Sequence, residues 1–403
     1  YGGAGPEFDP ACYPADAVAV QSYRHTNYKK ERAGAFVDGD WTFSLAGMPN
    51  TLRGGLWYED QTRDETRDWH KITDTSQGKA FDEAPYWTQY DRTYPQETIK
   101  WYLENSIDIA DFTLTLGAKQ FLVDVEREDN FNEDPDVGVN SDSDVLISGG
   151  LLWQSPVEGL EFFAGYAENF KAITDEILER PESNLSILEP ETAENIELGF
   201  RYRADRLTAT ATYFEIDFSD RIVFLTQESG DGINFLIGTN GTFFNAGGID
   251  SAGLELTADL SLTDNLSLYS AYTYNDATYT GTGENPIDSQ LGVVPGNDVV
   301  GIPDHQLVLS LDWRWNNLMA GISGKYTGER PVRVDNSWIA DDYVTADLYM
   351  TYRGNRGPGS LSNWNVTLLV NNAFDETFLG GIAGEGAWIG PPRTVSASFT
   401  LDF

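Results

Sequence analysis

Apolar and polar residues alternate along most of this chain with a period of two. Within 306–314 the odd positions are apolar and the even positions are mostly polar, the apolar ones being Leu307, Leu309, Leu311 and Trp313. The same alternation recurs at 196–203, 254–262, 344–352 and 364–370. Successive side chains of a β-strand point to opposite faces, so the pattern predicts an all-β protein whose sheet has one apolar face.

The alternation predicts about fifteen strands. They cover residues 31–44, 51–63, 97–108, 112–126, 144–154, 159–170, 193–203, 206–218, 241–262, 265–278, 305–315, 318–328, 341–353, 363–371 and 392–403. The connections between them run short, long, short, long. Short turns at one end and long loops at the other are typical of transmembrane antiparallel β-barrels, whereas a soluble sandwich has no reason to sort its loops.

The residues on the two predicted faces support a barrel in a membrane. Tyr and Trp lie near strand ends on the apolar faces, as in an interfacial girdle: Trp41, Tyr58, Trp153, Tyr166, Tyr202, Tyr274, Trp313, Tyr326, Tyr352 and Trp364. The opposite faces carry charges that a polar lumen accepts but a packed core does not, among them Arg53, Glu59, Lys100, Glu104, Lys119, Arg201, Asp259, Asp312, Lys325 and Asp347.

Composition excludes several other classes. The 403 residues include 26 Lys and Arg against 64 Asp and Glu, a net charge of −38, so a basic nucleic-acid-binding face is excluded and we expect no nucleic-acid partner. One cysteine rules out a disulfide-stapled domain. No apolar run reaches the ~18 residues of a membrane helix. No HExxH, GxSxG or P-loop pattern occurs, so we expect no enzyme, no catalytic residues, no metal site and no cofactor.

Several motifs in the second half of the chain belong together. They are the Leu188–Gly199 segment LEPETAENIELG, Ile302–His305 (IPDH), Asn372–Phe378 (NAFDETF) and Gly390–Arg393 (GPPR) before the last strand. With these residues the chain resembles the carboxyl-terminal part of a TonB-dependent outer-membrane receptor, with Phe378 where the family more often has Tyr. Residues 160–403 carry the resemblance by motif, and 31–160 by strand pattern alone.

The resemblance implies a barrel of 22 strands with an amino-terminal plug. We therefore expect about fifteen strands of such a barrel, with the plug and first strands missing from this sequence. Residues 1–30 are then an extracellular loop and 31–403 the barrel. Cys12 is either half of a disulfide to a missing partner or an unpaired buried thiol.

The resemblance also implies a function. We expect a receptor of the bacterial outer membrane that imports a scarce ligand, with a ferric siderophore ahead of cobalamin, haem or oligosaccharide. Its partners are the TonB complex, reached through the missing plug, and the lipid and lipopolysaccharide of the membrane. A passive porin, or a structural barrel subunit of a larger assembly, is the alternative.

We expect ligand-binding residues on the outer loops and the upper lumen wall, and the segment 63–94 is the richest in residues that suit an iron chelate or a sugar. Guanidinium groups pair with carboxylates, and aromatic rings stack on flat ligands. The predicted ligand-binding residues are Arg63, Arg67, Trp69, His70, Trp87, Tyr90 and Arg92, with Tyr86 and Tyr94 beside them. The alternative is that they belong to the girdle and to loop packing. The acidic segment 124–144 is either a Ca²⁺ site or a solvated surface.

Overall fold

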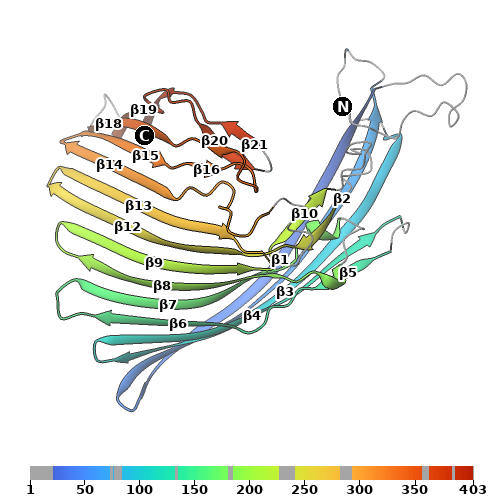
Figure 1. Cartoon of the computed structure of the whole chain (residues 1–403), viewed down its shortest axis with the longest axis horizontal. Helices are drawn as coiled ribbons and strands as arrows, with labels where there is room; N and C mark the ends of the chain where they lie inside the picture. Colours follow the sequence, from blue (N-terminus) through green and yellow to red (C-terminus); the bar gives the residue numbers. More distant parts are fainter. Residues whose placement is uncertain are drawn as a thin grey trace, which may run out of the picture.

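The computed structural model shows one large antiparallel sheet that curves through most of a barrel (Figure 1). It describes residues 21–72, 76, 84–131, 135–179, 185–226, 241–281, 293–355, 363–383 and 386–402. Fifteen strands follow one another across the sheet in chain order. They are β1 (Ser22–Leu45), β2 (Met48–Lys71), β3 (Trp87–Ile109), β4 (Phe112–Asp129), β6 (Leu146–Gln154), β7 (Leu160–Lys171), β8 (Glu191–Arg203), β9 (Leu207–Ser219), β12 (Ile249–Thr263), β13 (Leu266–Tyr279), β14 (His305–Trp315), β15 (Leu318–Thr327), β18 (Tyr343–Asn355), β19 (Asn363–Asn371) and β22 (Thr394–Asp402).

Smaller elements lie in the long connections. β5 (Val137–Asn140) pairs with β4. Three two-stranded sheets are formed by β10 (Ile222–Thr226) with β11 (Gly241–Asn245), β16 (Arg330–Pro331) with β17 (Ile339–Ala340), and β20 (Leu379–Ala383) with β21 (Gly386–Ile389). The helices are α1 (Asp175–Leu178) and the 3₁₀ turn η2 (Leu185–Ile187). Within the described ranges, no helix has both the length and the apolar character needed to span a membrane.

The predicted strands are confirmed in number and order, but several ends were wrong. β1 begins at Ser22, β2 continues to Lys71 and β3 begins at Trp87, so residues 22–30 are strand and the predicted loop 64–96 shrinks to 72–86. Hydrophobic alternation stops where a strand leaves the lipid, but backbone pairing does not need an apolar face and continues. The predicted strand 241–262 is two strands, β11 and β12, because residues 246–248 separate them.

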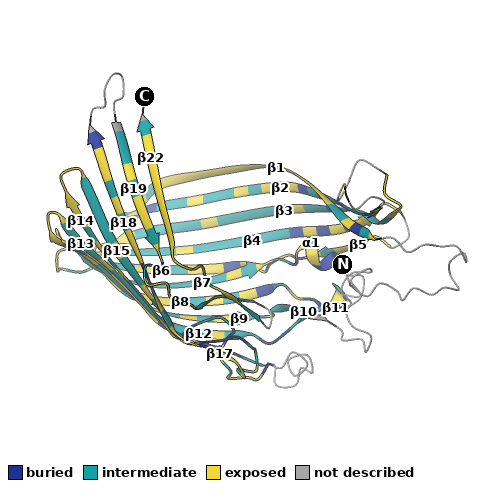
Figure 2. Ribbon diagram, turned by 90° about the horizontal axis from the view of Figure 1, so that it is seen from above, coloured by how far each residue is buried: buried dark blue, intermediate teal, exposed yellow. Residues whose placement is uncertain are grey.

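The apolar faces point outward and are exposed to the surroundings. On β12 and β14, which flank β13, Leu254, Leu256, Leu309 and Leu311 are each more than one-third exposed. The accessible surface is 24,817 Å², against roughly 15,600 Å² for a soluble monomer of this mass. Buried residues concentrate toward the end of the sheet that carries α1 and β5 (Figure 2). The sheet therefore has an apolar outer face with no protein partner of its own, as expected in lipid.

An aromatic belt runs across the outward face at the short-turn end. Phe112, Trp153, Phe162 and Phe200 face one another in register on β4, β6, β7 and β8, with successive ring centroids 6.0, 5.4 and 6.2 Å apart. Aromatic side chains at one level of neighbouring strands are typical of a membrane interface. Trp153, one of the predicted girdle residues, is part of this belt.

The outward face of β2 changes character along its length. It is apolar as far as Tyr58, through Leu52 and Leu56, and then becomes polar. The polar positions on that face are Asp60, Thr62, Asp64, Thr66 and Asp68. Since β2 remains paired to β1 throughout, the strand continues beyond the lipid band as an exposed wall.

The connections alternate in length as predicted. The turn between β1 and β2 is Ala46–Gly47, with positive φ of 52° and 82°, as a two-residue hairpin requires. Ser22 pairs with Lys71, so β1 begins at the end of the sheet that carries the long connections. In the described residues the sheet ends at β1 on one side and at β22 on the other, and these two strands do not pair. Cys12 lies outside the described residues.

Candidate functional site

The short helix α1 is fixed against the inner wall by one arginine from each of three neighbouring strands. Arg63 comes from β2, Arg92 from β3 and Arg127 from β4. The backbone of the Asp175–Leu178 helix is too short to be stable by itself, so its position depends on these contacts. The inner wall and α1 together form the candidate site.

Arg63 pairs with three carboxylates. Its guanidinium donates to Asp175 at 2.7 Å, Glu65 at 2.6 Å and Glu179 at 2.9 Å, and it lies 4.0 Å from the centre of the Tyr94 ring. Only 8% of Arg63 is exposed. Charge-assisted hydrogen bonds in a buried setting are strong, and the loss of one partner leaves an uncompensated charge.

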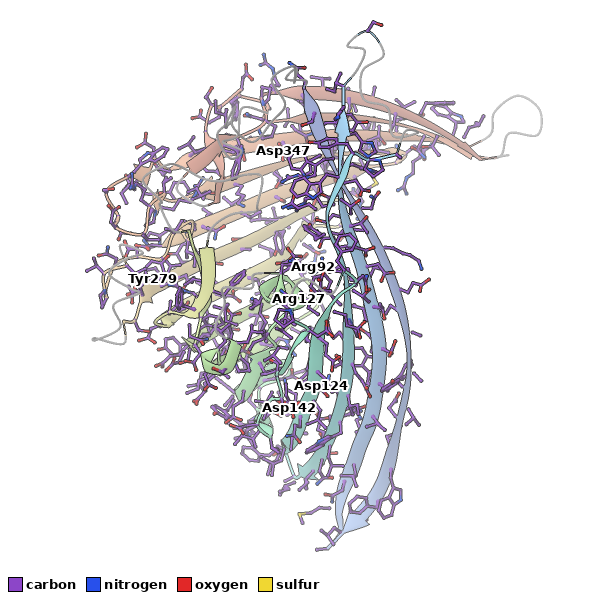
Figure 3. The ribbon with its side chains drawn as sticks, turned by 90° about the vertical axis from the view of Figure 1, so that its right-hand side faces the viewer. Arg92, Asp124, Arg127, Asp142, Tyr279 and Asp347 are labelled. Carbon is purple, nitrogen blue, oxygen red and sulfur yellow. The ribbon has the colours of Figure 1, made fainter. Side chains whose placement is uncertain are left out.

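Arg92 and Arg127 bind the other end of α1. Arg127 donates to the carbonyl of Leu178 at 3.0 Å and to that of Pro135 at 2.9 Å, and Arg92 donates to the carbonyl of Glu179 at 3.4 Å. Figure 3 shows both arginines on the inner side of the sheet. The last carbonyls of a helix have no partner within it, so cationic donors there satisfy them.

An apolar cluster beneath α1 completes the attachment. Ile177 and Leu178 are buried against Val123 and Val125 of β4 and against Tyr94 of β3. Full burial of an aliphatic side chain is worth about 1.5–3 kcal/mol. The helix is therefore held by apolar contact below and by ion pairs at its ends.

A pocket of about 480 Å³ opens beside this arrangement. Its lining joins β1, β2, α1 and β11 and consists of Tyr28, Lys30, Arg63, Asp175, Glu176, Glu179 and Phe243. Three carboxylates and two cations face it, so its charge is mixed with a slight excess of acid. A volume of this size suits a small ligand.

The structure brings most of the predicted ligand-binding residues to this inner face. The guanidinium groups of Arg67 and Arg92 lie 4.7 and 4.8 Å from the centre of the Tyr90 ring. The Tyr90 hydroxyl donates a hydrogen bond to Glu65. Trp69 stacks on Trp87 at 6.0 Å, and its indole N–H donates to Gln89 at 3.0 Å.

One predicted residue is not brought to this face. His70 follows Trp69 in β2 and therefore points to the opposite side, where it stacks on Tyr23 of β1. All seven predicted residues lie in β2 or β3, and so belong to the wall of the sheet and not to the connection between these strands.

Sequence reasoning missed Arg127, Glu65 and Asp175. Arg127 on β4 and Asp175 in α1 are separated from the predicted cluster by strand connections. Glu65 lies within the segment 63–94, but the cluster was chosen for its arginines, histidine and aromatic rings. A signal did exist for Arg127, which is the only arginine in the acidic segment 124–144.

In that acidic segment, carboxylates bind backbone and amide groups. Asp142 accepts the Val123 N–H at 2.8 Å, Asp136 accepts the Asp129 N–H at 3.0 Å, and Asp124 accepts the Asn140 side chain at 3.1 Å. Across residues 124–131 and 135–144, which the structure describes, no three carboxylates converge as a group able to hold a metal ion. These acids fasten β5 and its flanks to β4.

The carboxyl-terminal motifs form the scaffold. Asn372, with φ of 50°, accepts the Glu376 N–H at 2.8 Å and donates to the carbonyls of Glu376 and Pro391 at 2.8 and 3.2 Å. Asp375 accepts the Arg393 N–H at 2.8 Å. Residues of NAFDETF and GPPR therefore join each other and direct the chain into β22.

Comparison with known proteins agrees with this architecture. A family model described as "TonB dependent receptor-like, beta-barrel" matches residues 5–373. The ferrichrome outer membrane transporter/phage receptor of Escherichia coli K12 is 29% identical over 178 residues, which is 42% of this chain and 22% of that protein. The ferrioxamine receptor of Yersinia enterocolitica is 26% identical over 322 residues, 77% of this chain and 40% of that protein.

Solved structures show the same fold. The unliganded ferric citrate transporter FecA superposes with a TM-score of 0.73 at 20% identity, covering 94% of this chain and 56% of that one. The siderophore receptor PiuA of Acinetobacter baumannii gives 0.71 at 18% identity, covering 94% and 56%. The chain thus spans less than half of these curated relatives and about half of these structures.

An antiparallel barrel wall with an apolar outer face, short turns at one end and long connections at the other is the architecture of an outer-membrane β-barrel. The chain belongs to the TonB-dependent receptor β-barrel family. Its location is the bacterial outer membrane.

Proposed function

We propose that this chain is the barrel part of a receptor that imports a ferric siderophore across the outer membrane, driven by the TonB complex. The family match over residues 5–373 is the observation that carries the proposal. Relatives whose names specify ferrichrome and ferrioxamine support the ligand class. The outward apolar face contacts lipid, and the polar wall beyond it meets lipopolysaccharide.

The ligand surface in this proposal is the inner face at the long-connection end. Arg67, Tyr90 and Trp87 offer cationic and aromatic groups, while Arg63 and Arg92 shape the wall by holding α1. Tyr28 and Lys30 of β1 extend the surface into the pocket. His70 is outside it.

The charge of the pocket limits the classes of ligand that can bind there. Arg63 pairs with both Asp175 and Glu179, but its single charge cannot neutralise both, so the three carboxylates and two cations of the lining leave a net negative charge. A polyanionic chelate gains little from such a lining. The proposal therefore favours a neutral or positively charged ferric chelate.

Haem is the second candidate ligand. Hemin receptors of Yersinia pestis and Yersinia enterocolitica, both 23% identical, align with 71% and 84% of this chain. Their names and their long alignments are the observations that favour it.

Uptake by iron-starved cells tests the proposal. A strain lacking the gene is compared with the complemented strain for uptake of ⁵⁵Fe bound to neutral, cationic and anionic chelators, and for growth on hemin. We expect saturable uptake of a neutral or cationic ferric chelate that stops when TonB is removed. Uptake that is linear in concentration and independent of TonB would identify a passive porin, and no difference between strains would refute import.

A further inference from the structure

Two of the three histidines of the chain meet at the outer end of the β1–β2 hairpin. His25 on β1 is directly opposite Asp68 on β2 in the strand register. His70 is two residues beyond Asp68 and so lies on the same face. One ligand atom from each of these three side chains lies within 4.8 Å of the others.

This cluster is separate from the candidate ligand site. Arg63 and Arg67 of β2 point to the inner face, and the even-numbered Asp68 and His70 therefore point outward. The cluster lies past Tyr58, where the outward face of β2 has become polar. It is thus beyond the lipid band, where an aqueous ion has access.

Neighbouring side chains orient Asp68 and His70. The Thr88 hydroxyl donates to Asp68 Oδ1 at 2.7 Å, and Asn27 Nδ2 donates to Asp68 Oδ2 at 3.3 Å. The Tyr23 ring stacks on His70, with centroids 5.3 Å apart and planes within 10°. Each carboxylate oxygen has two acceptor sites, so these bonds leave Asp68 able to bind a further partner.

We propose that His25, Asp68 and His70 form a binding site for a divalent transition-metal ion, with Zn²⁺ as the best fit. Two imidazoles and one carboxylate are a typical zinc ligand set, with solvent in the fourth position. Zinc bonds of ~2.0–2.2 Å place tetrahedral ligand atoms roughly 3.3–3.6 Å apart. The present separations reach that distance by side-chain rotation.

The types of ligand atom in the cluster favour a transition-metal ion over a hard cation. Ca²⁺ and Mg²⁺ require several oxygen ligands, and the cluster offers a single carboxylate. Because His25 is on one strand and the other two ligands are on the next, the ion joins β1 to β2 outside the membrane. This role is independent of which ligand the receptor imports.

The test uses the whole receptor in detergent. Zn²⁺ is titrated calorimetrically, and Co²⁺ serves as a spectroscopic probe because its visible absorption reports coordination geometry and imidazole ligands. The variants are H25A, D68N and H70A. The matched control is H305A, since His305 is the third histidine and lies on β14 beside Tyr272, at 3.0 Å from its hydroxyl.

We expect one Zn²⁺ per receptor, and at least about 10–100-fold weaker binding in each ligand variant. The Thr88→Val variant, which removes an orienting bond only, should weaken binding by about 10-fold. Binding in H305A should equal that of the wild type. Affinity should fall on acidification, because imidazole must be neutral to bind metal.

Three results would overturn the proposal. They are no Zn²⁺ binding by the wild type at millimolar concentration, equal weakening in H305A and the ligand variants, and competition by Ca²⁺ at the same concentration as Zn²⁺. The wild-type Co²⁺ spectrum decides the ligand type without any variant. Far-UV circular dichroism confirms that each variant keeps its sheet.

Discussion

Arg63 Nε donates to Asp175 Oδ2 at 2.7 Å, across 112 residues of sequence. The bond joins the inner wall of the barrel to a helix in a long connection. Without it, Glu65, Asp175 and Glu179 would be three carboxylates in one largely buried place. Among the groups that hold α1, and with it one side of the pocket, Arg63 is therefore the one that offsets these carboxylates.

Replacing Arg63 with Ala should release α1 from the wall. We expect the local opening free energy to fall by roughly 3–5 kcal/mol, because buried negative charges lose their partner. Hydrogen exchange at the Ile173 and Ile177 amides, which are bonded to Ser141 and Thr174, measures it. Arg53→Ala is the control, since Arg53 is 60% exposed and 3.8 Å from Glu104, and it should change stability by less than ~1 kcal/mol. Equal effects of the two variants would refute the role of Arg63.

Leu256→Arg should destabilise the barrel in lipid by about 2–4 kcal/mol, since Leu256 faces outward on β12. The adjacent Thr257 faces the lumen, where Glu255 and Asp259 lie on the same side, so Thr257→Arg should change stability by less than ~0.5 kcal/mol. Urea unfolding of the whole receptor from vesicles measures both. Equal losses would contradict the assignment of the two faces.

Asn372→Ala should cost roughly 2–4 kcal/mol. The variant loses three hydrogen bonds of the Asn372 side chain and must keep a positive φ without the side chain that tolerates it. Asn371→Ala removes a single 3.3 Å bond to Thr394 from an extended residue, and less than ~1 kcal/mol is expected. The same unfolding assay compares the two variants. A smaller loss of unfolding free energy for Asn372→Ala than for Asn371→Ala would contradict the stabilising role of the Asn372 side chain in the turn.

Glu176→Lys should shift ligand preference toward anionic ferric chelates. The change alters the pocket charge by two units next to Lys30, and we expect uptake affinity for a cationic chelate to fall by about 5–10-fold. Glu158→Lys, in the turn between β6 and β7, carries the same change away from the pocket and should have no effect. Competition uptake assays measure the ratio. An unchanged ratio in Glu176→Lys would show that the ligand binds elsewhere.

The sequence predicted fifteen strands in their correct order because lipid on one side and a polar lumen on the other impose alternation of apolar and polar residues wherever a strand crosses the membrane. The ends of β1, β2 and β3 were missed because no lipid acts on Ser22–Lys30 or on Asp64–Lys71. The Tyr58-to-Asp60 change on one face of β2 was visible in the sequence and would have marked this boundary.

The site was predicted only in part because its contacts cross between elements. Arg63, Tyr90 and Arg92 were found through their closeness in sequence, whereas Asp175 and Arg127 reach them through strand pairing and one helix. His25 and His70 are 45 positions apart in the sequence, and no short motif links them. A hairpin register brings them to one face, and hydrophobic alternation does not reveal a register between polar strand ends.

The polar extension of β1–β3 has a consequence for whatever approaches the cell. From Tyr58 to Lys71 the β2 strand runs about 43 Å at ~3.3 Å per residue. In the proposed orientation, an antibody, a bacteriophage or a protein toxin arriving from the medium meets this polar extension of the sheet before it meets the bilayer. This polar end of β2 is therefore a surface of the receptor that agents from outside can reach without entering the membrane.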